Sequence, residues 1–407
     1  MDLSIYNLRL RDVLTICVLG LLFLGIAMVQ SAAMHITNPP PVDEQNQAAQ
    51  TAGTADYRWT DTGRRHVIFA VVALAAYFTV GHIDYRRLVG SGWWRRPVLW
   101  MLGTAVFACL IVLIPHVGTA VNGARRWLPL GFTQVQPSEL GKWGVVLFLA
   151  WWMTHPASQL DRFFRGFVPA LVPVGIICLL VVVEDFGTAA LIGLASLLVL
   201  LAGRAKWWHL LMAVPPAVAA GVWFVMSEPY RWRRFTAFWD PFAAPQREGY
   251  HMIQSLLSFA TGGLVGKGLG NGVQKLGYLP EDTTDFIFAV ICEELGLFGA
   301  LLTVALYLGI LYVVFQAIRQ KIDPFGRLLA FGIGAMIGLQ ALINIAVATV
   351  SVPTKGMSLP LVSAGGSGLV ITCCALGLLH SICRIGEEAQ TLPADDGQDG
   401  VPAAQPL

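Results

Sequence analysis

Long runs of apolar residues, separated by shorter polar segments, recur along the whole chain. An α-helix of about 17–25 apolar residues is long enough to cross the ~30 Å hydrocarbon core of a bilayer. Ten runs are predicted to be such helices: 12–33, 66–83, 97–115, 139–154, 167–183, 187–203, 208–226, 285–315, 328–350 and 366–385. We therefore expect an all-α polytopic membrane protein of about ten transmembrane helices.

Basic residues in the short connections predict the orientation of these helices. Arg86 follows the second run, Arg162 the fourth, Arg204 the sixth and Arg319 the eighth, so all four fall on the same side of the membrane. Short loops rich in Arg and Lys remain on the cytoplasmic side. Both termini should therefore be cytoplasmic, and the long segment 227–284 should be an outer loop between helices 7 and 8.

Composition agrees with a membrane domain. Of 407 residues, 56% are hydrophobic and 13% are charged, whereas a soluble domain carries roughly 25% charged residues. Residues 1–385 are interpreted as a single transmembrane domain. The end of the chain, 386–407, is acidic and rich in Pro and Ala, which is typical of a disordered tail.

Three predicted outer loops, 34–65, 116–138 and 227–284, differ from plain connectors. The last two contain an unexpected set of basic residues: Arg125, Arg126, Arg231, Arg233, Arg234, Arg247, Lys267 and Lys275. Arginine binds phosphate through paired hydrogen bonds, so this cluster suits a lipid that carries phosphate. Anchoring to lipid headgroups is the alternative.

Two stretches of the loop 227–284 have recognisable local patterns. Apolar residues at 253, 256, 257 and 260 share one helical face, which predicts a short helix lying on the membrane. The run GGLVGKGLGNG is rich in glycine but does not follow a strand. It favours a flexible turn over a phosphate-binding loop.

Ionisable residues also occur at membrane depth. Glu139 and Lys142 are three residues apart and share a helical face, and Glu293 and Glu294 lie about two turns into the eighth run. Such charges cost a few kcal/mol at a helix centre and face a cavity or one another. Internal pairing and a functional site both remain open for them. The residues alone indicate an outward site for an amphiphilic anion, in either an enzyme or a transporter.

Several motifs together resemble those of one family. They are NGARRWLPLG with VQPSELGK (122–142), EDFGTA (184–189), RRFTAFWDP (233–241), the stretch 249–296 and PTKGMSLPLVSAGGSG (353–368). The chain resembles the SEDS family (shape, elongation, division and sporulation proteins), most of all its cell-division branch. The resemblance implies a ten-helix peptidoglycan glycosyltransferase that polymerises lipid II into β-1,4 glycan at the outer face of the cytoplasmic membrane, for septal wall synthesis.

The resemblance also implies roles for particular residues. Asp285, in Thr284-Asp285-Phe286, would be the base that deprotonates the attacking sugar hydroxyl in an inverting displacement. A helix N-terminal acid that complements the dipole is the alternative for this residue. Substrate contacts are assigned to Arg126, Glu139, Lys142, Arg234, Lys267, Lys275 and Lys355, with Glu139 orienting Lys142.

A divalent cation and several partners are also expected. Asp285, Glu281 and Asp282 could hold Mg²⁺ or Mn²⁺ against the substrate pyrophosphate, because both ions prefer hard oxygen ligands. The implied partners are lipid II, a class B penicillin-binding protein transpeptidase, other divisome proteins and membrane lipids, with no nucleic acid. The implied location is the inner membrane at the division septum. A lipid II flippase and a non-catalytic division scaffold remain the alternatives.

Overall fold

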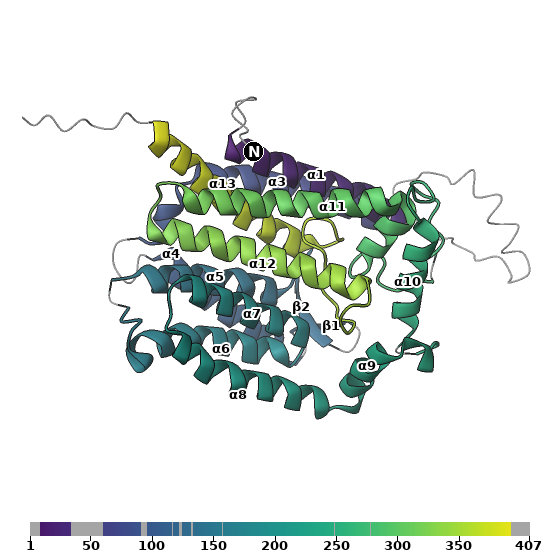
Figure 1. Ribbon diagram of the computed structural model, residues 1–407, viewed down its shortest axis with the longest axis horizontal. Coiled ribbons are helices and arrows are strands. Elements are labelled where there is room, and N and C mark those ends of the chain that lie inside the picture. The colour runs from purple at the N-terminus through teal and green to yellow at the C-terminus, as the bar shows by residue number, and fades with distance from the viewer. Residues whose placement is uncertain are drawn as a thin grey trace, which may run out of the picture.

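The computed structural model describes residues 9–33, 60–90 and 96–391, with short gaps at 116, 122–123, 132, 157, 248 and 277. Most of the predicted loop 34–65 lies outside the described residues. A bundle of roughly parallel helices forms the body of the molecule (Figure 1). Its long helices are α1 (Leu10–Ala32), α3 (Asp61–His82), α4 (Pro97–Val112), α5 (Pro137–Thr154), α6 (Val168–Val182), α7 (Phe186–Ala202), α8 (Trp207–Met226), α11 (Ile287–Arg319), α12 (Pro324–Ala348) and α13 (Gly366–Thr391).

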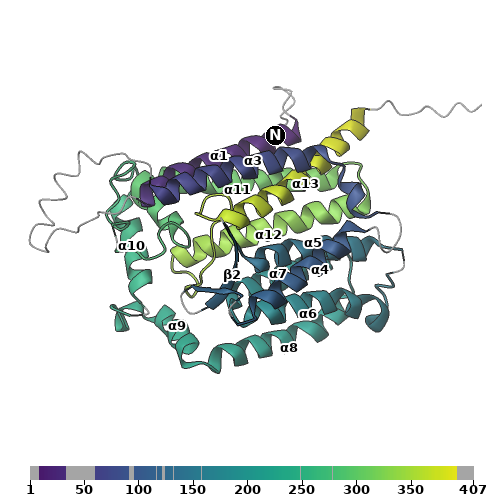
Figure 2. The same ribbon diagram turned by 180° about the vertical axis from the view of Figure 1, so that it is seen from behind.

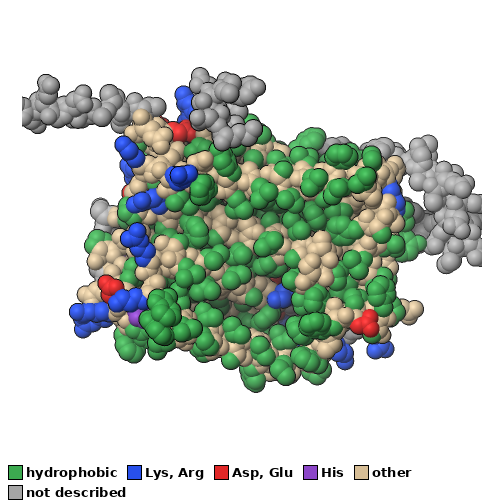
Figure 3. All heavy atoms as spheres, in the orientation of Figure 1, with side chains coloured by type: hydrophobic (Ala, Val, Ile, Leu, Met, Phe, Trp, Pro, Cys, Tyr) green, Lys and Arg blue, Asp and Glu red, His purple; other side chains and the backbone are tan. Residues whose placement is uncertain are grey.

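These helices coincide with the predicted apolar runs, which confirms an all-α membrane protein. Seven helices of the described chain are long and apolar enough to cross a membrane, while α4 and α7 are apolar but shorter. The count of ten spans therefore stays a prediction. Helix α8 illustrates the lipid-facing character, because Leu210 is its only buried residue. Figure 3 shows a mainly hydrophobic face with charged side chains gathered toward its ends.

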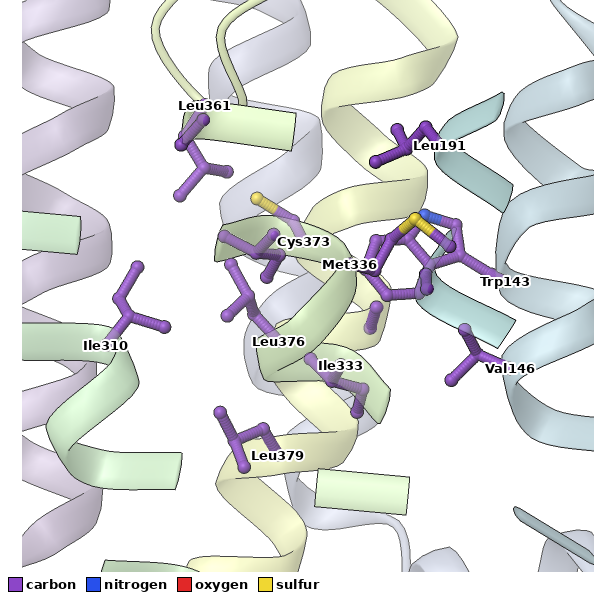
Figure 4. Close-up of a cluster of buried hydrophobic side chains, with 14 of the residues drawn as sticks. Trp143, Val146, Leu191, Ile310, Ile333, Met336, Leu361, Cys373, Leu376 and Leu379 are labelled. Carbon is purple, nitrogen blue, oxygen red and sulfur yellow. The ribbon is translucent and has the colours of Figure 1, made fainter. Parts of the chain in front are cut away.

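The core of the bundle lies around α12 and α13. Trp143 and Val146 of α5, Leu191 of α7 and Met336 of α12 point into one cluster with Leu376 of α13 (Figure 4). Helix α13 also packs along α3, and α1 packs along α11 (Figure 2). The interior thus joins the N-terminal, middle and C-terminal helices into one packed unit.

The predicted outer loops contain regular structure of their own. Segment 116–138, one of the three loops that differ from plain connectors, forms a three-stranded antiparallel sheet of β1 (Thr119–Val121), β2 (Ala124–Leu130) and β3 (Thr133–Val135). The sequence does not predict this sheet, because its strands are short and Pro129 within β2 hides the strand pattern. Short 3₁₀ or π segments occur at Tyr85–Leu88, Phe163–Phe167 and Pro241–Ala243.

Two helices occupy the long outer loop, α9 (Pro229–Trp239) and α10 (Tyr250–Gly262). The predicted short helix is therefore confirmed as α10. Its buried residues are Met252, Ser255, Ser258 and Gly262, and the Ser255 hydroxyl donates to the Ala348 carbonyl of α12 (2.6 Å). Leu256, on the predicted apolar face, is 38% exposed, so attachment of that face to the membrane surface stays a prediction.

The C-terminal helix extends farther than predicted. Helix α13 ends at Thr391, so the disordered tail placed at 386–407 starts too early, and residues 392–407 lie outside the described residues. Within these additional turns, Glu387 pairs with Arg11 of α1 at 3.5 Å. This ion pair holds the last turns of α13 against the start of α1.

Candidate active site

Four segments from distant parts of the sequence meet at one end of the bundle. They are strand β2, the start of α7, the segment that leads into α11, and the connection 349–365 between α12 and α13. Helix α9 lies at the same end of the bundle (Figure 1). Figure 3 shows a hollow on this face where basic side chains appear amid hydrophobic ones.

Asp285 lies at the centre of this convergence, immediately before α11. Its carboxylate rests against the backbone of Gly356, where an added Cβ would lie 3.0 Å from Oδ2 and 4.0 Å from Nη1 of Arg126. Burial, together with the negative charges of Glu281 and Asp185, raises the pKa of Asp285 to about 7, while Arg126 and Arg234 oppose the rise. The group can therefore accept a proton near neutral pH.

The backbone around Asp285 is held by hydrogen bonds from two directions. Asn344 of α12 donates through Nδ2 to the carbonyls of Asp285 (2.8 Å) and Met357 (2.7 Å). The Ser363 hydroxyl donates to the Thr284 carbonyl at 2.5 Å. These bonds join the two loops that meet at Asp285 and Gly356, so the carboxylate has a defined position.

Two cations, Arg126 of β2 and Lys355 of the connection 349–365, lie around Asp185 at the start of α7. Nη1 of Arg126 on β2 lies 3.6 Å from Oδ2 of Asp185, which caps α7 by accepting from the backbone N–H and the hydroxyl of Thr188. The ammonium of Lys355 lies 4.4 Å from the ring centroid of Phe186. Burial lowers the pKa of Lys355, and Asp185 counteracts this.

The outer helices α9 and α10 contribute a second basic side to the site. The positive charge of Arg234 on α9 lowers the pKa of Asp285 and that of His251 on α10. The pKa of His251 is lowered by burial and then by Arg234. Its ring stacks on Phe286 with centroids 5.9 Å apart and an interplanar angle of 11°. Of the predicted site residues, Asp285, Arg126, Arg234 and Lys355 therefore form one group.

Lys142 and Glu139 form a separate, interior pair. Nζ of Lys142 lies 2.8 Å from Oε1 of Glu139, and only 2% of the Lys142 side chain is exposed. It also donates to Oε1 of Gln340 on α12 (2.8 Å), whose amide nitrogen donates to the Ser358 carbonyl (2.9 Å). Glu139 and Lys142 thus form an ion pair. The pair links α5 and α12 below the loop that carries Lys355, and a substrate contact of Lys142 stays a prediction.

Lys267 has an internal partner, one of the buried acids of α11. Its Nζ lies 2.7 Å from Oε1 of Glu293, whose side chain is fully buried. The same carboxylate accepts backbone N–H groups from Val273 (2.9 Å) and Gln274 (3.1 Å). A carboxylate with this many donors is satisfied, so Glu293 stabilises the loop around it.

Lys275 is occupied in the same way by the second acid. Its Nζ lies 2.7 Å from Oε1 of Glu294 and 2.7 Å from the hydroxyl of Ser31 on α1, and its side chain is 1% exposed. Gly270 and Gly272 donate backbone N–H groups to Glu294 at 3.1 and 3.3 Å. Internal pairing, one of the two interpretations for these acids, is therefore what the structure contains.

The glycine-rich loop, residues 263–276, closes onto a break in α11. At Gly296 the backbone leaves the helical conformation with φ 64°, which a residue with a Cβ rarely adopts. The carbonyls of Glu293 and Glu294 before this break accept the backbone N–H groups of Lys267 (3.0 Å) and Gly268 (2.9 Å). The loop does surround an anionic group, but that group is the protein's own carboxylate pair.

The predicted metal ligands are not brought together. Within the described residues there is no group of three or more His, Cys, Asp or Glu placed to hold a metal ion. Glu281 is exposed and accepts from the Thr284 hydroxyl (2.9 Å). Asp282 is buried, and Lys275 is the cation that opposes the rise of its pKa to about 7. The described residues therefore do not form a cation site by themselves, and a bound divalent cation stays a prediction.

Four residues of the site have no role predicted from the sequence. Asp185 lies in the EDFGTA motif, at the outer end of a predicted helix. Asn344 and Gln340 are polar residues inside an apolar run, and that contrast was the available signal for both. Nothing in the sequence distinguishes Gly356 except its place in the PTKG motif.

Comparisons with known proteins identify the family. The family model described as "Cell cycle protein", that of FtsW, RodA and SpoVE, matches residues 11–387. The chain is 38% identical over 380 residues to the "Probable peptidoglycan glycosyltransferase FtsW" of Thioalkalivibrio sulfidiphilus, covering 92% of this chain and 90% of that protein. It is also 38% identical over 372 residues to the protein of the same description from Nitrosococcus halophilus, covering 88% of each.

Solved structures of similar proteins share the fold. A chain in the structure described as "Structural coordination of polymerization and crosslinking by a peptidoglycan synthase complex" superposes with a TM-score of 0.70 at 27% identity, over 92% of this chain and 97% of that one. The rod shape determining protein RodA of Thermus thermophilus superposes with a TM-score of 0.61 at 25% identity, over 91% and 95%.

Proposed function

The chain belongs to the cell cycle protein family of FtsW, RodA and SpoVE, and we propose that it is the peptidoglycan glycosyltransferase of cell division. The relatives described as FtsW support this activity. The substrate is lipid II, and the product is a β-1,4 glycan strand made at the outer face of the cytoplasmic membrane. The observation that carries the proposal is the carboxylate of Asp285, with a pKa of about 7, beside Arg126 and Gly356.

The proposed reaction is a single displacement with inversion. Asp285 accepts the proton of the attacking 4-hydroxyl as the oxygen forms its bond to the anomeric carbon of the second saccharide. The bond from that carbon to the lipid pyrophosphate breaks, and the electron pair leaves with the phosphate oxygen. Arg126, Lys355 and Arg234 stabilise the negative charge that develops there, in a site partly shielded from water.

The other predicted contact residues support this site from within the protein. Lys267 and Lys275 neutralise Glu293 and Glu294, so they hold the loop that leads to Asp285. Lys142 ties α5 to α12 through Glu139 and Gln340. In the proposed mechanism these lysines position the segments that carry Asp285 and Lys355, and their direct contact with substrate stays a prediction.

A class B penicillin-binding protein is the proposed partner, and the division septum the proposed location. The peptidoglycan synthase complex that the chain resembles couples polymerisation to crosslinking, which supports a transpeptidase partner for this chain. Other divisome proteins and membrane lipids complete the proposed surroundings.

The test is glycan synthesis by the purified protein in liposomes with lipid II, with and without the transpeptidase and Mg²⁺. Asp285→Asn should abolish polymer formation while lipid II still binds. Asp282→Asn is the matched control, because this buried acid has a similarly raised pKa but is not the proposed base, and its polymer yield should stay near that of the wild type. Polymer from Asp285→Asn at the wild-type rate, or lipid II that is translocated and never joined, would overturn the proposal.

A further inference from the structure

Four side chains form a continuous line of contacts from the junction of α8 and α9 to Lys355. The guanidinium carbon Cζ of Arg231 on α9 lies 3.7 Å from the ring centroid of Phe224 on α8. The Phe224 ring stacks on Phe186 at the start of α7, with centroids 5.7 Å apart and an interplanar angle of 18°. The ammonium of Lys355 lies 4.4 Å from the centroid of the same Phe186 ring. These four residues form the aromatic link.

Two kinds of attraction hold the aromatic link together. A cation within about 6 Å of a ring centroid, over the face of the ring, is attracted by the negative charge density there, and both Arg231 and Lys355 meet this distance. Offset rings that lie nearly parallel also attract one another, as Phe224 and Phe186 do. Nη1 of Arg231 donates to the Phe224 carbonyl as well (3.2 Å), so the guanidinium is fixed at the junction of α8 and α9.

The aromatic link attaches the outer end of α8 to the bundle. Helices α8 and α9 follow one another along one edge of the molecule (Figure 1), and Leu210, near the start of α8, is the only buried residue of that helix. At the other end of α8, Trp223 is 71% exposed, whereas Phe224 is half-buried. A Cβ added at Gly221 would lie 3.8 Å from the Phe186 ring. Phe186 therefore packs against this end of α8.

Lys355 itself lies against the start of α7. A Cβ added at Gly187 would lie 3.2 Å from Cδ of Lys355, so the stem of the lysine passes close to backbone that carries no side chain. Asp185 is the acid whose charge acts on the ammonium, and Arg126 lies 3.6 Å from the same carboxylate. Two cations thus share Asp185, and the Phe186 ring gives Lys355 a contact that is not shared with Arg126.

We propose that Phe186 and Phe224 are positioning residues, which hold the ammonium of Lys355 in the proposed active site and make its place depend on the junction of α8 and α9. Lys355 is the group that meets substrate in the proposed mechanism, and the two rings act only through it. The effect on catalysis rests on the proposed glycosyltransferase function. The contact between the rings and the ammonium does not, and it can be measured without any reaction of lipid II.

The first measurement is the rate at which an amine-acylating reagent labels Lys355 at pH 8, in the full chain in detergent, followed by mass spectrometry. Phe186→Leu keeps an apolar side chain but removes the ring, and an ammonium that loses such a contact gives up its proton more readily. Labelling should become about tenfold faster. Phe224→Leu should raise the rate about threefold, because Phe186 loses the ring that holds it. Lys206, whose side chain is 51% exposed, is the internal control and should be labelled equally in every variant.

Matched variants separate positioning from a general loss of packing. Phe224→Tyr retains the ring, so Lys355 should be labelled as in the wild type. Arg231→Gln removes the guanidinium from the far end of the aromatic link and should have a smaller effect in the same direction as Phe224→Leu. Because it leaves both rings in place, it also tests the link if the leucine variants do not fold. Trp223→Leu, at the exposed neighbour of Phe224, should change nothing.

The second measurement is the single-turnover rate of glycan formation from lipid II in liposomes. Phe224→Leu should lower the rate at saturating lipid II about tenfold, with little change in lipid II affinity, because Lys355 acts on charge that develops as the pyrophosphate leaves. In a Lys355→Met background the same substitution should lower the rate no further, since the ring acts through the lysine.

The outcomes distinguish the aromatic link from the proposed function. Labelling of Lys355 at the wild-type rate in both Phe186→Leu and Phe224→Leu would overturn the proposal. So would a loss of rate in Phe224→Leu that adds fully to the loss in Lys355→Met. Altered labelling in a protein that makes no polymer under any condition would instead overturn the proposed function and leave the contact of the rings with Lys355 standing.

Discussion

The raised pKa of Asp285 predicts how the rate of polymerisation depends on pH. Burial and two neighbouring acids, Glu281 and Asp185, raise this pKa to about 7, whereas Arg126 and Arg234 lower it. A general base works only in its deprotonated form. The rate should therefore rise with pH and level off above the pKa.

The magnitude follows from this value. For a pKa of about 7, about 9% of the carboxyl groups are ionised at pH 6 and about 91% at pH 8. The rate should accordingly increase about tenfold between these values. An aspartate with the ordinary pKa of about 3.9 would be fully ionised across the range and would give no change.

Two substitutions should move the midpoint in opposite directions. Arg126→Gln removes a positive charge that favours the ionised form of Asp285, so the midpoint should shift to higher pH. Glu281→Gln removes a negative charge that opposes ionisation, so the midpoint should shift to lower pH. Arg126→Gln should also lower the plateau, because Arg126 is a proposed contact of the pyrophosphate.

The assay is a single-turnover measurement of glycan bond formation from lipid II in liposomes between pH 6 and pH 8.5. A single turnover removes product release from the observed rate. A flat profile over this range, or midpoints of the two variants that shift in the same direction, would refute the assignment of Asp285 as the base.

Three further predictions concern the groups that hold the site. Lys275→Met should destabilise the protein by about 3–5 kcal/mol in thermal unfolding, because it leaves the buried carboxylate of Glu294 without its cation. Adding Glu294→Gln should restore part of this loss, and additive effects of the two substitutions would contradict the pairing. Gly356→Ala should reduce the single-turnover rate about tenfold to a hundredfold with little change in lipid II binding. The added Cβ would lie 3.0 Å from Oδ2 of Asp285 and displace the carboxylate. An unchanged rate would show that this contact is not needed. Asn344→Leu should lower the same rate about tenfold, since two carbonyls lose their donor, and a change confined to thermal stability would contradict a positioning role.

The sequence predicted the helices well because their signal is strong and local. An apolar run of membrane length specifies a helix whatever its neighbours are, so errors arise mainly at the ends. Helix α3 begins at Asp61, not at residue 66, because polar residues extend its first turn. Short strands carry a weaker signal, and the sheet around Arg126 was missed.

The partners of the charged residues were not predictable in the same way. Lys267 and Lys275 belong to a loop full of basic residues, and any of several acids could have neutralised them. Ser31 and Glu294 are 263 residues apart in the sequence, and only the packing of α1 on α11 brings them together.

The contact between α1 and the glycine-rich loop bears on how the protein is made. The loop bonds to Glu293, Glu294 and Ser31, yet α11 leaves the ribosome long after α1. Until α11 has entered the bilayer, Lys275 cannot pair with Glu294, and the segment that leads to Asp285 lacks the contacts that hold it. The proposed glycosyl transfer at the outer surface therefore becomes possible only when most of the transmembrane domain has been synthesised. A chain stalled before this point lacks the segment that carries Asp285.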